Sequence, residues 1–187
     1  LGYFARMCPE KGLDTLVDAF IRLKQTDQVP GLKLAIGGGC QPGDEDFVRE
    51  QKKRLRTAGL LGDAEFLPNL DRDAKLAFYR GLTALSVPAM FGEAFGLYVV
   101  EAMASGVPVV APNHASFPEM VEQNQAGVIC EKGSVAALAD AIGQLLLDRE
   151  RLAKCAAAGR QAALQTHNIE RMAESFVARL AKLSIKR

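Results

Sequence analysis

Short apolar runs alternate along the chain with longer segments in which apolar residues recur every three or four positions. The longer spacing places one apolar set on a single helix face: Leu13, Leu16, Val17, Phe20 and Leu23. Short runs, such as those at 32–36 and 107–111, are followed by glycine or proline, which is typical of buried strands. The pattern therefore predicts a repeated strand–helix unit.

The same reading assigns an element to most of the chain. We expect strands over residues 1–5, 32–36, 65–67, 82–87, 107–111 and 127–130. We expect helices over residues 13–23, 44–58, 72–79, 97–104, 135–147, 149–164 and 169–183. Strands separated by helices pair in parallel, and right-handed crossovers place helices on both faces of the sheet. The predicted fold class is α/β, a doubly wound parallel sheet with extra C-terminal helices, in one domain.

Composition narrows the classes of function. The 187 residues are 49% hydrophobic and 24% charged, which fits one soluble globular domain. The net charge of +1 gives no reason to expect nucleic acid as a partner. No apolar run approaches the roughly 20 residues of a membrane span, and we expect no secretory signal. Because the chain opens on a strand without Met, we expect a domain of a longer protein.

Cysteine usage points to a reducing compartment. The four cysteines, at positions 8, 40, 130 and 155, lie far apart and form no Cys-x-x-Cys pair. Only two histidines, His114 and His167, accompany them, which argues against a structural zinc site. We expect free thiols in a reducing cytosol.

The loop from Arg6 to Gly12, after the first predicted strand, is the first candidate binding loop. Ligands bind doubly wound sheets beyond the carboxyl ends of the strands, where this loop should lie. Arg6 offers a planar fork of donors and Lys11 a mobile point charge, a pair suited to a diphosphate. The alternative is an ordinary surface loop in which Glu10 forms a salt bridge.

The second candidate loop, Phe91–Leu97, precedes a predicted helix. That helix should begin near Ala94–Gly96 and leave backbone N–H groups unpaired, which makes an anion site strengthened by the helix dipole. Gly96 allows a phosphate to approach the backbone closely. Glu93 should point out of this loop.

Two further features accompany this loop. Glu101 projects from an otherwise apolar helix and needs a partner if it is buried. A ribose diol would serve; a backbone amide or a solvent-facing edge is the alternative. The third loop, 114–119, offers Ser116, either as a hydroxyl for the same cleft or as the N-cap of a helix that starts with Pro118 and Glu119.

Together these residues resemble the donor-binding C-terminal domain of retaining GT-B glycosyltransferases, the glycosyltransferase family 4 group. The segment Gly2–Gly12 resembles the family's G-R-x-x-x-E-K-G element, and Glu93–Glu101 matches its E-x7-E signature. Pro118-Glu119 followed by Gly127 resembles its P-E-(I/V)…G segment. The chain departs from the family at Ala115-Ser116, where Gly-Gly is frequent, and at Ala89, where Ser is frequent.

The resemblance covers essentially the whole chain and implies a Rossmann-like fold and a set of roles. Arg6 and Lys11 would neutralise the donor diphosphate, and amides of Ala94, Phe95, Gly96 and Leu97 would hold phosphate oxygens. Glu101 would bind the ribose, and Glu93 would contact the transferred sugar, with Glu93, Arg6 and Lys11 as the catalytic set. The base would rest near Leu67, Pro68 and Leu76, and Gly37 would add a further donor contact.

The resemblance also implies partners and a location. The donor would be a UDP-, GDP- or ADP-sugar, and the enzyme a hexosyltransferase needing no metal and no cofactor. Asp71 and Asp73, the one Asp-x-Asp spacing near the cleft, are expected to begin a helix instead. The acceptor-binding half would precede this domain, so the domain alone should bind donor but transfer little sugar. The full-length enzyme would be cytoplasmic, with peripheral association at the inner face of the membrane left open.

Two other readings compete with this one. A dinucleotide-dependent oxidoreductase would need G-x-G-x-x-G after the first strand, but that loop carries Arg-x4-Lys and the Gly37-Gly38-Gly39 run follows the second strand. A non-catalytic nucleotide-binding or scaffolding module that retains the fold stays open, although such a module would have no physical need for the basic pair and both acids.

Overall fold

Six parallel strands form one sheet in the order β3-β2-β1-β4-β5-β6 within residues 1–184, the part of the chain that the computed structural model describes. The strands are β1 (Gly2–Phe4), β2 (Leu34–Gly38), β3 (Ala64–Pro68), β4 (Leu85–Ser86), β5 (Val109–Pro112) and β6 (Gly127–Cys130). From β1 the chain adds strands in one direction, and from β4 it adds them in the other. The predicted doubly wound parallel sheet is confirmed, and its order is that of the Rossmann fold.

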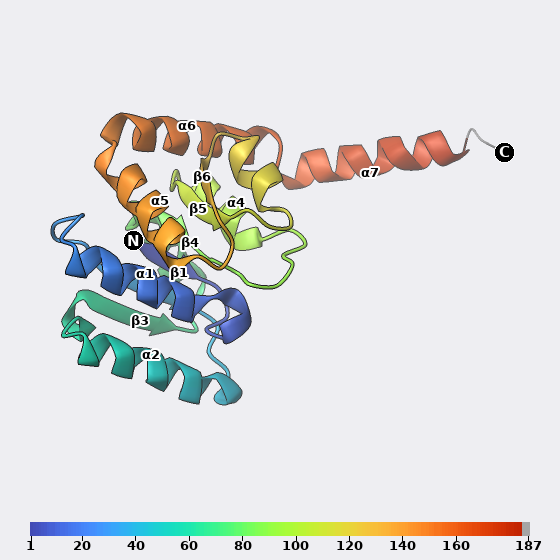
Figure 1. The fold of residues 1–187 in the computed structure, drawn as a ribbon. Helices are drawn as coiled ribbons and strands as arrows, with labels where there is room; N and C mark the ends of the chain where they lie inside the picture. The colour runs from blue at the N-terminus through green and yellow to red at the C-terminus, as the bar shows by residue number, and fades with distance from the viewer. Residues whose placement is uncertain (185–187) are drawn as a thin grey trace.

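Seven α-helices lie in the described residues, and all except the last of them pack around the sheet (Figure 1). They are α1 (Leu13–Gln25), α2 (Glu45–Thr57), α3 (Arg72–Arg80), α4 (Leu97–Ala104), α5 (Val135–Leu147), α6 (Arg149–Gln165) and α7 (Ile169–Ser184). On one face α1 packs between α2 and α5, while α4 packs against α6. The apolar face predicted for α1 is buried in the core.

Strand boundaries differ from the predicted ones where glycine or proline intervenes. β2 begins two residues later than predicted, and Gly37 and Gly38 belong to the strand, since they pair with Leu67 and Pro68 of β3. The predicted strand over 82–87 is reduced to the two residues of β4, because the chain turns away before Pro88. β5 likewise starts after Pro108, which has no N–H to donate to a ladder.

Helix α7 extends away from the body of the molecule (Figure 1). Its apolar residues recur at helical spacing, and Ile169, Met172, Phe176 and Val177 are each between 63% and 71% exposed. The stripe is therefore solvent-exposed in this structure. None of the helices in the described residues is both long enough and apolar enough to span a membrane.

Candidate functional site

The loops after β1 and β4 lie on either side of the point at which the strand order reverses. In open α/β sheets the crevice at this point is where ligands bind. Lys11 ends the short 3-10 turn that follows β1, and Glu93 lies in the loop between β4 and α4. Lys11 Nζ donates to Glu93 Oε2 at 2.5 Å, so one ion pair joins the two loops.

Gly12 allows the first loop to lie against the second. Its φ of 71° is in the left-handed region, and a Cβ at this position would come 2.0 Å from the carbonyl oxygen of Pro88. Only glycine fits this contact without moving the backbone. The backbone N–H of Met90 donates to the carbonyl oxygen of Glu10 at 3.1 Å and closes the same junction. The position of Lys11 therefore depends on backbone packing as well as on its own ion pair.

The Glu93 carboxylate is largely enclosed, with 15% of its side chain exposed against 32% for Lys11. The Tyr98 hydroxyl also donates to Glu93 Oε2, at 3.1 Å. Burial by itself would raise the pKa of Glu93, but the hydrogen bonds from Lys11 and Tyr98 outweigh it and hold that pKa below its ordinary value. Glu93 is therefore ionised at neutral pH.

Helix α4 begins at Leu97, as its hydrophobic spacing predicted and just after the Ala94–Gly96 start expected from the loop, with Gly96 as its N-cap in the left-handed conformation. No side chain caps this end, so the first backbone N–H groups of the helix have no side-chain acceptor. Phe95 and Leu97 are exposed beside it, at 48% and 67%. The end of α4 nearest Glu93 thus combines backbone N–H groups that lack a side-chain cap with the positive end of a helix dipole.

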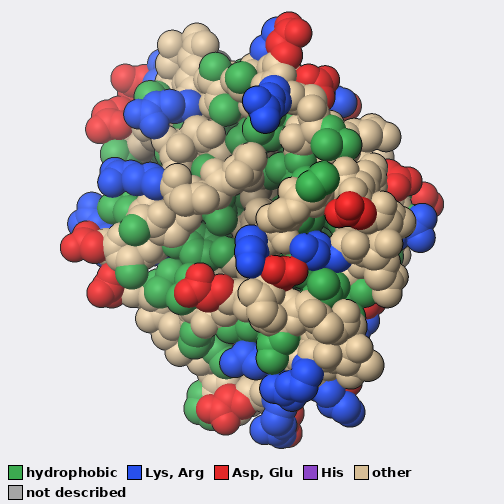
Figure 2. All heavy atoms as spheres, turned by 90° about the vertical axis from the view of Figure 1, so that its left-hand side faces the viewer, with side chains coloured by type: hydrophobic (Ala, Val, Ile, Leu, Met, Phe, Trp, Pro, Cys, Tyr) green, Lys and Arg blue, Asp and Glu red, His purple; other side chains and the backbone are tan. Residues whose placement is uncertain are grey.

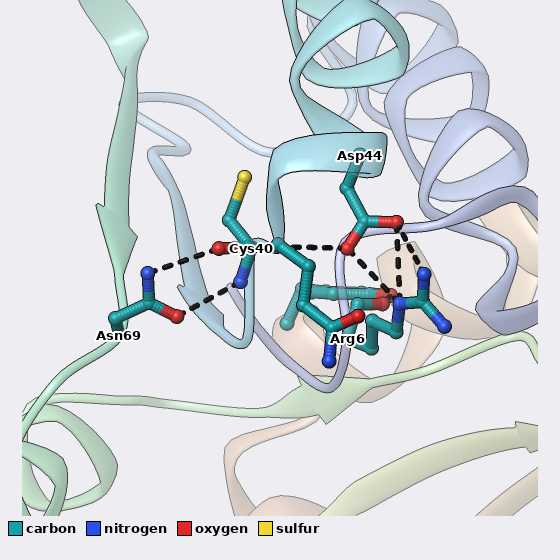
Figure 3. A network of polar contacts seen from close by, with 6 residues as sticks. Arg6, Cys40, Asp44 and Asn69 are labelled. Carbon is teal, nitrogen blue, oxygen red and sulfur yellow. Dashed lines mark hydrogen bonds and ion pairs between the residues drawn. The ribbon is translucent and has the colours of Figure 1, made fainter.

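Arg6 has a different partner from Lys11. Its Nε and Nη2 atoms donate to the two oxygens of Asp44, at 2.9–3.2 Å (Figure 3). Arg6 lies in the loop after β1, and Asp44 lies between β2 and α2. The Asp44 side chain is 4% exposed and also accepts from the backbone N–H of Gln41. The Arg6 guanidinium, followed by the Gln41 amide, lowers the pKa of Asp44. The structure therefore places Arg6 at the carboxyl edge of the sheet, held by an acid that the sequence reading had assigned only to the start of a helix.

The loops after β2 and β3 are held together beside this pair. Asn69 and the backbone of Cys40 exchange two hydrogen bonds, of 2.9 and 3.0 Å, as Figure 3 shows. Gly38 lies so close to β1 that a Cβ would come 2.0 Å from the carbonyl oxygen of Ala5. The Asn69 side chain therefore joins the loops after β2 and β3 at the edge of the site.

A hollow of about 560 Å³ lies between these loops and α3. Its lining consists of Phe4, Gly38, Gly39, Asn69, Leu70, Asp71, Arg72 and Lys75. The residues predicted around the base lie elsewhere: Gly37 is buried within β2, Leu67 is part of β3, and Leu76 is exposed on α3. Pro68 lines a separate apolar pocket with Phe66. These four assignments therefore stay predictions, and the hollow itself is lined by residues next to them in the sequence, such as Gly38 and Lys75.

Glu101, on α4, is paired with α3. Lys75 Nζ donates to Oε1 at 2.6 Å and the Tyr79 hydroxyl donates to Oε2 at 3.0 Å. The carboxylate therefore already has protein partners, neither of which was predicted. Their spacing of four residues on α3 places both on one helix face, and that is the signal from which they could have been found.

The third loop braces the second. The Ser116 hydroxyl donates to the backbone carbonyl oxygen of Glu93 at 2.9 Å, and the N-cap of the next helical turn, Pro118–Glu122, is Phe117. The alternative in which Ser116 is the N-cap is wrong, although Pro118 and Glu119 do begin the turn. On α3, Asp71 is the N-cap and accepts from the Ala74 N–H, as the predicted helix start requires. Within residues 1–184, no three His, Cys, Asp or Glu side chains are grouped as a metal site would need.

A second hollow lies near the amino ends of the strands, on the face of the molecule shown in Figure 2. It occupies about 400 Å³ beside Leu34 and Leu82, near the starts of the strands. Asp63 borders it and binds Lys24 and Lys33 at 2.9 and 2.8 Å. The two lysines therefore neutralise this acid.

The sequence matches the family described as Glycosyl transferases group 1 over residues 1–162. The chain belongs to this family. A GDP-mannose-dependent alpha-(1-6)-phosphatidylinositol monomannoside mannosyltransferase of Mycobacterium tuberculosis is 32% identical over 163 residues, covering 84% of this chain and 40% of that protein. The glycogen synthase of M. tuberculosis is 34% identical over 160 residues, covering 85% of this chain and 36% of that enzyme. The chain thus spans less than half the length of these glycosyltransferase relatives.

Solved glycosyltransferase structures share the fold. HepE from Anabaena, in complex with UDP, superposes with a TM-score of 0.86 at 25% identity, covering 97% of this chain and 48% of that one. The C-terminal domain of a glycosyl transferase group 1 protein from Francisella tularensis gives a TM-score of 0.80 at 28% identity, covering 90% and 85%. The chain therefore has the fold of a C-terminal GT-B glycosyltransferase domain, as the family resemblance implied.

Proposed function

We propose that this domain binds the nucleoside-diphosphate sugar of a retaining glycosyltransferase, with the diphosphate at the junction of the first two loops. The observation that carries the proposal is the contact of Lys11 with Glu93 beside the uncapped start of α4. It gathers a cation, free backbone amides and an ionised acid at the switch point of the sheet. Support comes from the HepE structures, which are complexes with UDP and with UDP-glucose.

The backbone amides of α4 and the Lys11 ammonium group bind the diphosphate in this proposal. Amides at the start of α4 donate to phosphate oxygens, and the helix dipole favours their negative charge. Lys11 adds a full positive charge within reach of the same position. As the sugar leaves, charge develops on the nucleoside diphosphate, and donors already in place stabilise it without reorganisation. In this proposal the catalytic contribution of the domain is the stabilisation of the leaving group.

Arg6 contributes to the diphosphate while it stays paired with Asp44. A guanidinium has five N–H donors, and Asp44 engages Nε and Nη2, so further donors remain on Nη1 and Nη2. The Arg6 side chain is 51% exposed, so these donors are accessible. Asp44 thereby orients Arg6 instead of competing for it.

The nucleoside occupies the hollow between β2, β3 and α3. Glu101 accepts hydrogen bonds from the ribose, and the base lies against Gly38, Gly39 and Leu70, with Phe4 beneath. Glu93 faces the transferred sugar with its charge held by Lys11. The departure at Ala115-Ser116 affects the preference for a particular sugar, because that loop approaches the sugar.

The complete reaction needs a second protein surface. We propose that a longer protein supplies the acceptor site, that the transfer retains the anomeric configuration of a hexose and that it proceeds without a metal ion. Two relatives, a mannosyltransferase and a glycogen synthase, support hexosyl transfer. The isolated domain should bind donor but transfer little sugar. Peripheral association of the full-length enzyme at the inner face of the membrane is consistent with the phosphatidylinositol named for one relative.

Calorimetric titration of the domain with UDP, GDP and ADP tests the proposal. At least one should bind, and Lys11→Met should raise its Kd about 10- to 100-fold, the equivalent of a charged hydrogen bond. Lys53→Met is the matched control, because Lys53 forms an exposed pair with Glu50 on α2. Binding of none of the three by the folded domain, or an equal loss in both variants, would overturn the proposal.

A further inference from the structure

We propose that Lys75 and Tyr79 are positioning residues that set the Glu101 carboxylate for a ribose diol. The inference rests on the proposed function and extends it to two residues that no motif of the chain includes. Both lie on α3, one helical turn apart, and both direct their polar atoms at the same acid on α4.

The two donors divide the carboxylate between them. Lys75 Nζ binds Oε1 and the Tyr79 hydroxyl binds Oε2, at 2.6 and 3.0 Å. An ionised carboxylate has about four acceptor sites, two on each oxygen. Each oxygen therefore keeps one site free, and two adjacent free sites match the two adjacent hydroxyls of a ribose. Rotation of the carboxylate about its last bond would break both contacts at once.

The donors differ in what they supply. Tyr79 is 1% exposed, and its ring packs against Phe4 and Phe78 at centroid distances of 5.1 and 5.9 Å. This packing holds the Tyr79 hydroxyl in one position relative to Glu101. Lys75 is 30% exposed and also lines the hollow, so it adds positive charge at the rim of the nucleotide site.

The charge of Lys75 has a second consequence. Glu101 lies on a helix whose buried residues, Val99, Ala102 and Met103, are apolar and provide no donor to its carboxylate. Ser105 does bond to Glu101, but its hydroxyl donates to the backbone carbonyl. Without Lys75 an unneutralised acid would stand near the incoming diphosphate and repel it. Lys75 thus leaves the Glu101 carboxylate able to accept hydrogen bonds and reduces the repulsion between that carboxylate and the diphosphate.

A purely structural role, in which the pairs only fasten α3 to α4, makes a different prediction. Loss of a contact that only joins the two helices would lower the stability of the domain and weaken the binding of every nucleotide by the same factor. Loss of positioning would reduce the preference for a nucleotide that carries the ribose hydroxyls over one that lacks them. The discriminating quantity is the ratio of the Kd for a 2′,3′-dideoxynucleoside diphosphate to the Kd for its ribose counterpart.

The experiment measures this ratio by calorimetry, with whichever of UDP, GDP or ADP binds best and its dideoxy analogue. We expect a wild-type ratio of about 10 to 100, which corresponds to hydrogen bonds to a charged acceptor. Lys75→Met and Tyr79→Phe should each reduce it to below about one third of the wild-type ratio. Lys75→Met combined with Glu101→Gln should match Glu101→Gln alone, because Lys75 acts through that carboxylate.

Two matched variants separate the roles. Tyr98→Phe removes a hydroxyl from Glu93 instead, so the ratio should stay at the wild-type value whatever happens to overall affinity. Lys53→Met removes an exposed lysine of α2 and should also leave the ratio unchanged. An unchanged ratio in both Lys75→Met and Tyr79→Phe, with wild-type discrimination intact, overturns the positioning role alone. Failure of the wild-type domain to bind any of the nucleotides overturns the proposed function together with this inference.

Discussion

Lys11 Nζ and Glu93 Oε2 lie 2.5 Å apart although 82 residues separate the two side chains in the sequence. The pair crosses the point at which the strand order reverses, so it joins the two halves of the sheet as well as two loops. Its position beside the free amides of α4 distinguishes this edge from the opposite one, where Asp63 and its lysines are already satisfied. The following predictions depend on this arrangement and on the packing around it.

Gly12→Ala should destabilise the domain by about 2–5 kcal/mol, the sum of left-handed strain and a backbone clash. The added Cβ would meet the carbonyl oxygen of Pro88. Gly31→Ala is the matched control, since its φ is also 71° but no atom lies within 4 Å of the new Cβ. It should cost only about 1–2 kcal/mol. Urea denaturation measures both, and equal losses would show that the Gly12 contact is unimportant.

Asp44→Asn should weaken nucleoside-diphosphate binding by roughly 3- to 10-fold, because the neutral amide holds the Arg6 guanidinium less firmly. The backbone N–H of Gln41 keeps an acceptor in the substituted side chain. Asp46→Asn serves as the control, since Asp46 is 86% exposed and pairs with Arg49 on the surface of α2. Calorimetry on the two variants decides the point. A wild-type Kd for Asp44→Asn would mean that Arg6 does not act on the ligand from this position.

Asp63 should make stability depend on pH in the acid range. The hydrogen bonds from Lys24 and Lys33 lower its pKa from 3.8 to about 2. Because the unfolded chain takes up this proton first, the contribution is complete above pH 3.8 and is lost as the pH falls towards 2. Asp63→Asn should therefore show a shallower fall of unfolding free energy over this range.

Denaturation series at several pH values between 5 and 2.5 measure that slope. The double variant Lys24→Met/Lys33→Met should reduce it as Asp63→Asn does, because without the two ammonium groups the pKa of Asp63 returns towards its ordinary value. Parallel slopes for wild type and both variants would contradict the assignment.

Truncation after His167, which removes α7, should leave the unfolding free energy of the remaining domain within about 0.5 kcal/mol of that of the intact chain. The apolar residues of the helix, such as Ile169 and Phe176, are exposed and bury little surface against the core. The intact chain should self-associate more than the truncated one, because the exposed stripe favours association. Sedimentation velocity and urea denaturation test both statements, and a large loss of stability on truncation would refute them.

The architecture could be predicted from the sequence because its signals are local. Helix periodicity identified α4 and α5 with their observed limits, and the short apolar run of β6 did the same. β2 was misplaced by two residues because parallel pairing with β3 continues through Gly37 and Gly38, which in isolation read as a turn. The prediction failed where a partner strand, and not the local pattern, decides where a strand ends.

The candidate site was predictable only in part. Topology alone indicates that the loops of Lys11 and Glu93 lie at the same edge of the sheet. The side-chain partners could not be predicted in this way. Asp44 lies 38 residues from its partner Arg6, and Lys75 lies 26 residues from its partner Glu101. Such pairs depend on the exact phase of α3 and on the path of the β2–α2 loop, which hydrophobic spacing does not encode.

Backbone amide chemical shifts, followed by NMR during titration with a nucleoside diphosphate, test the location of the diphosphate most directly. The amides of Gly96 and Leu97 should shift strongly, with further shifts at Lys11 and Gly39, and Lys11→Met should require a much higher ligand concentration for the same changes. If the shifts instead gather at Lys33 and Asp63, at the opposite edge of the sheet, the diphosphate does not bind at the start of α4.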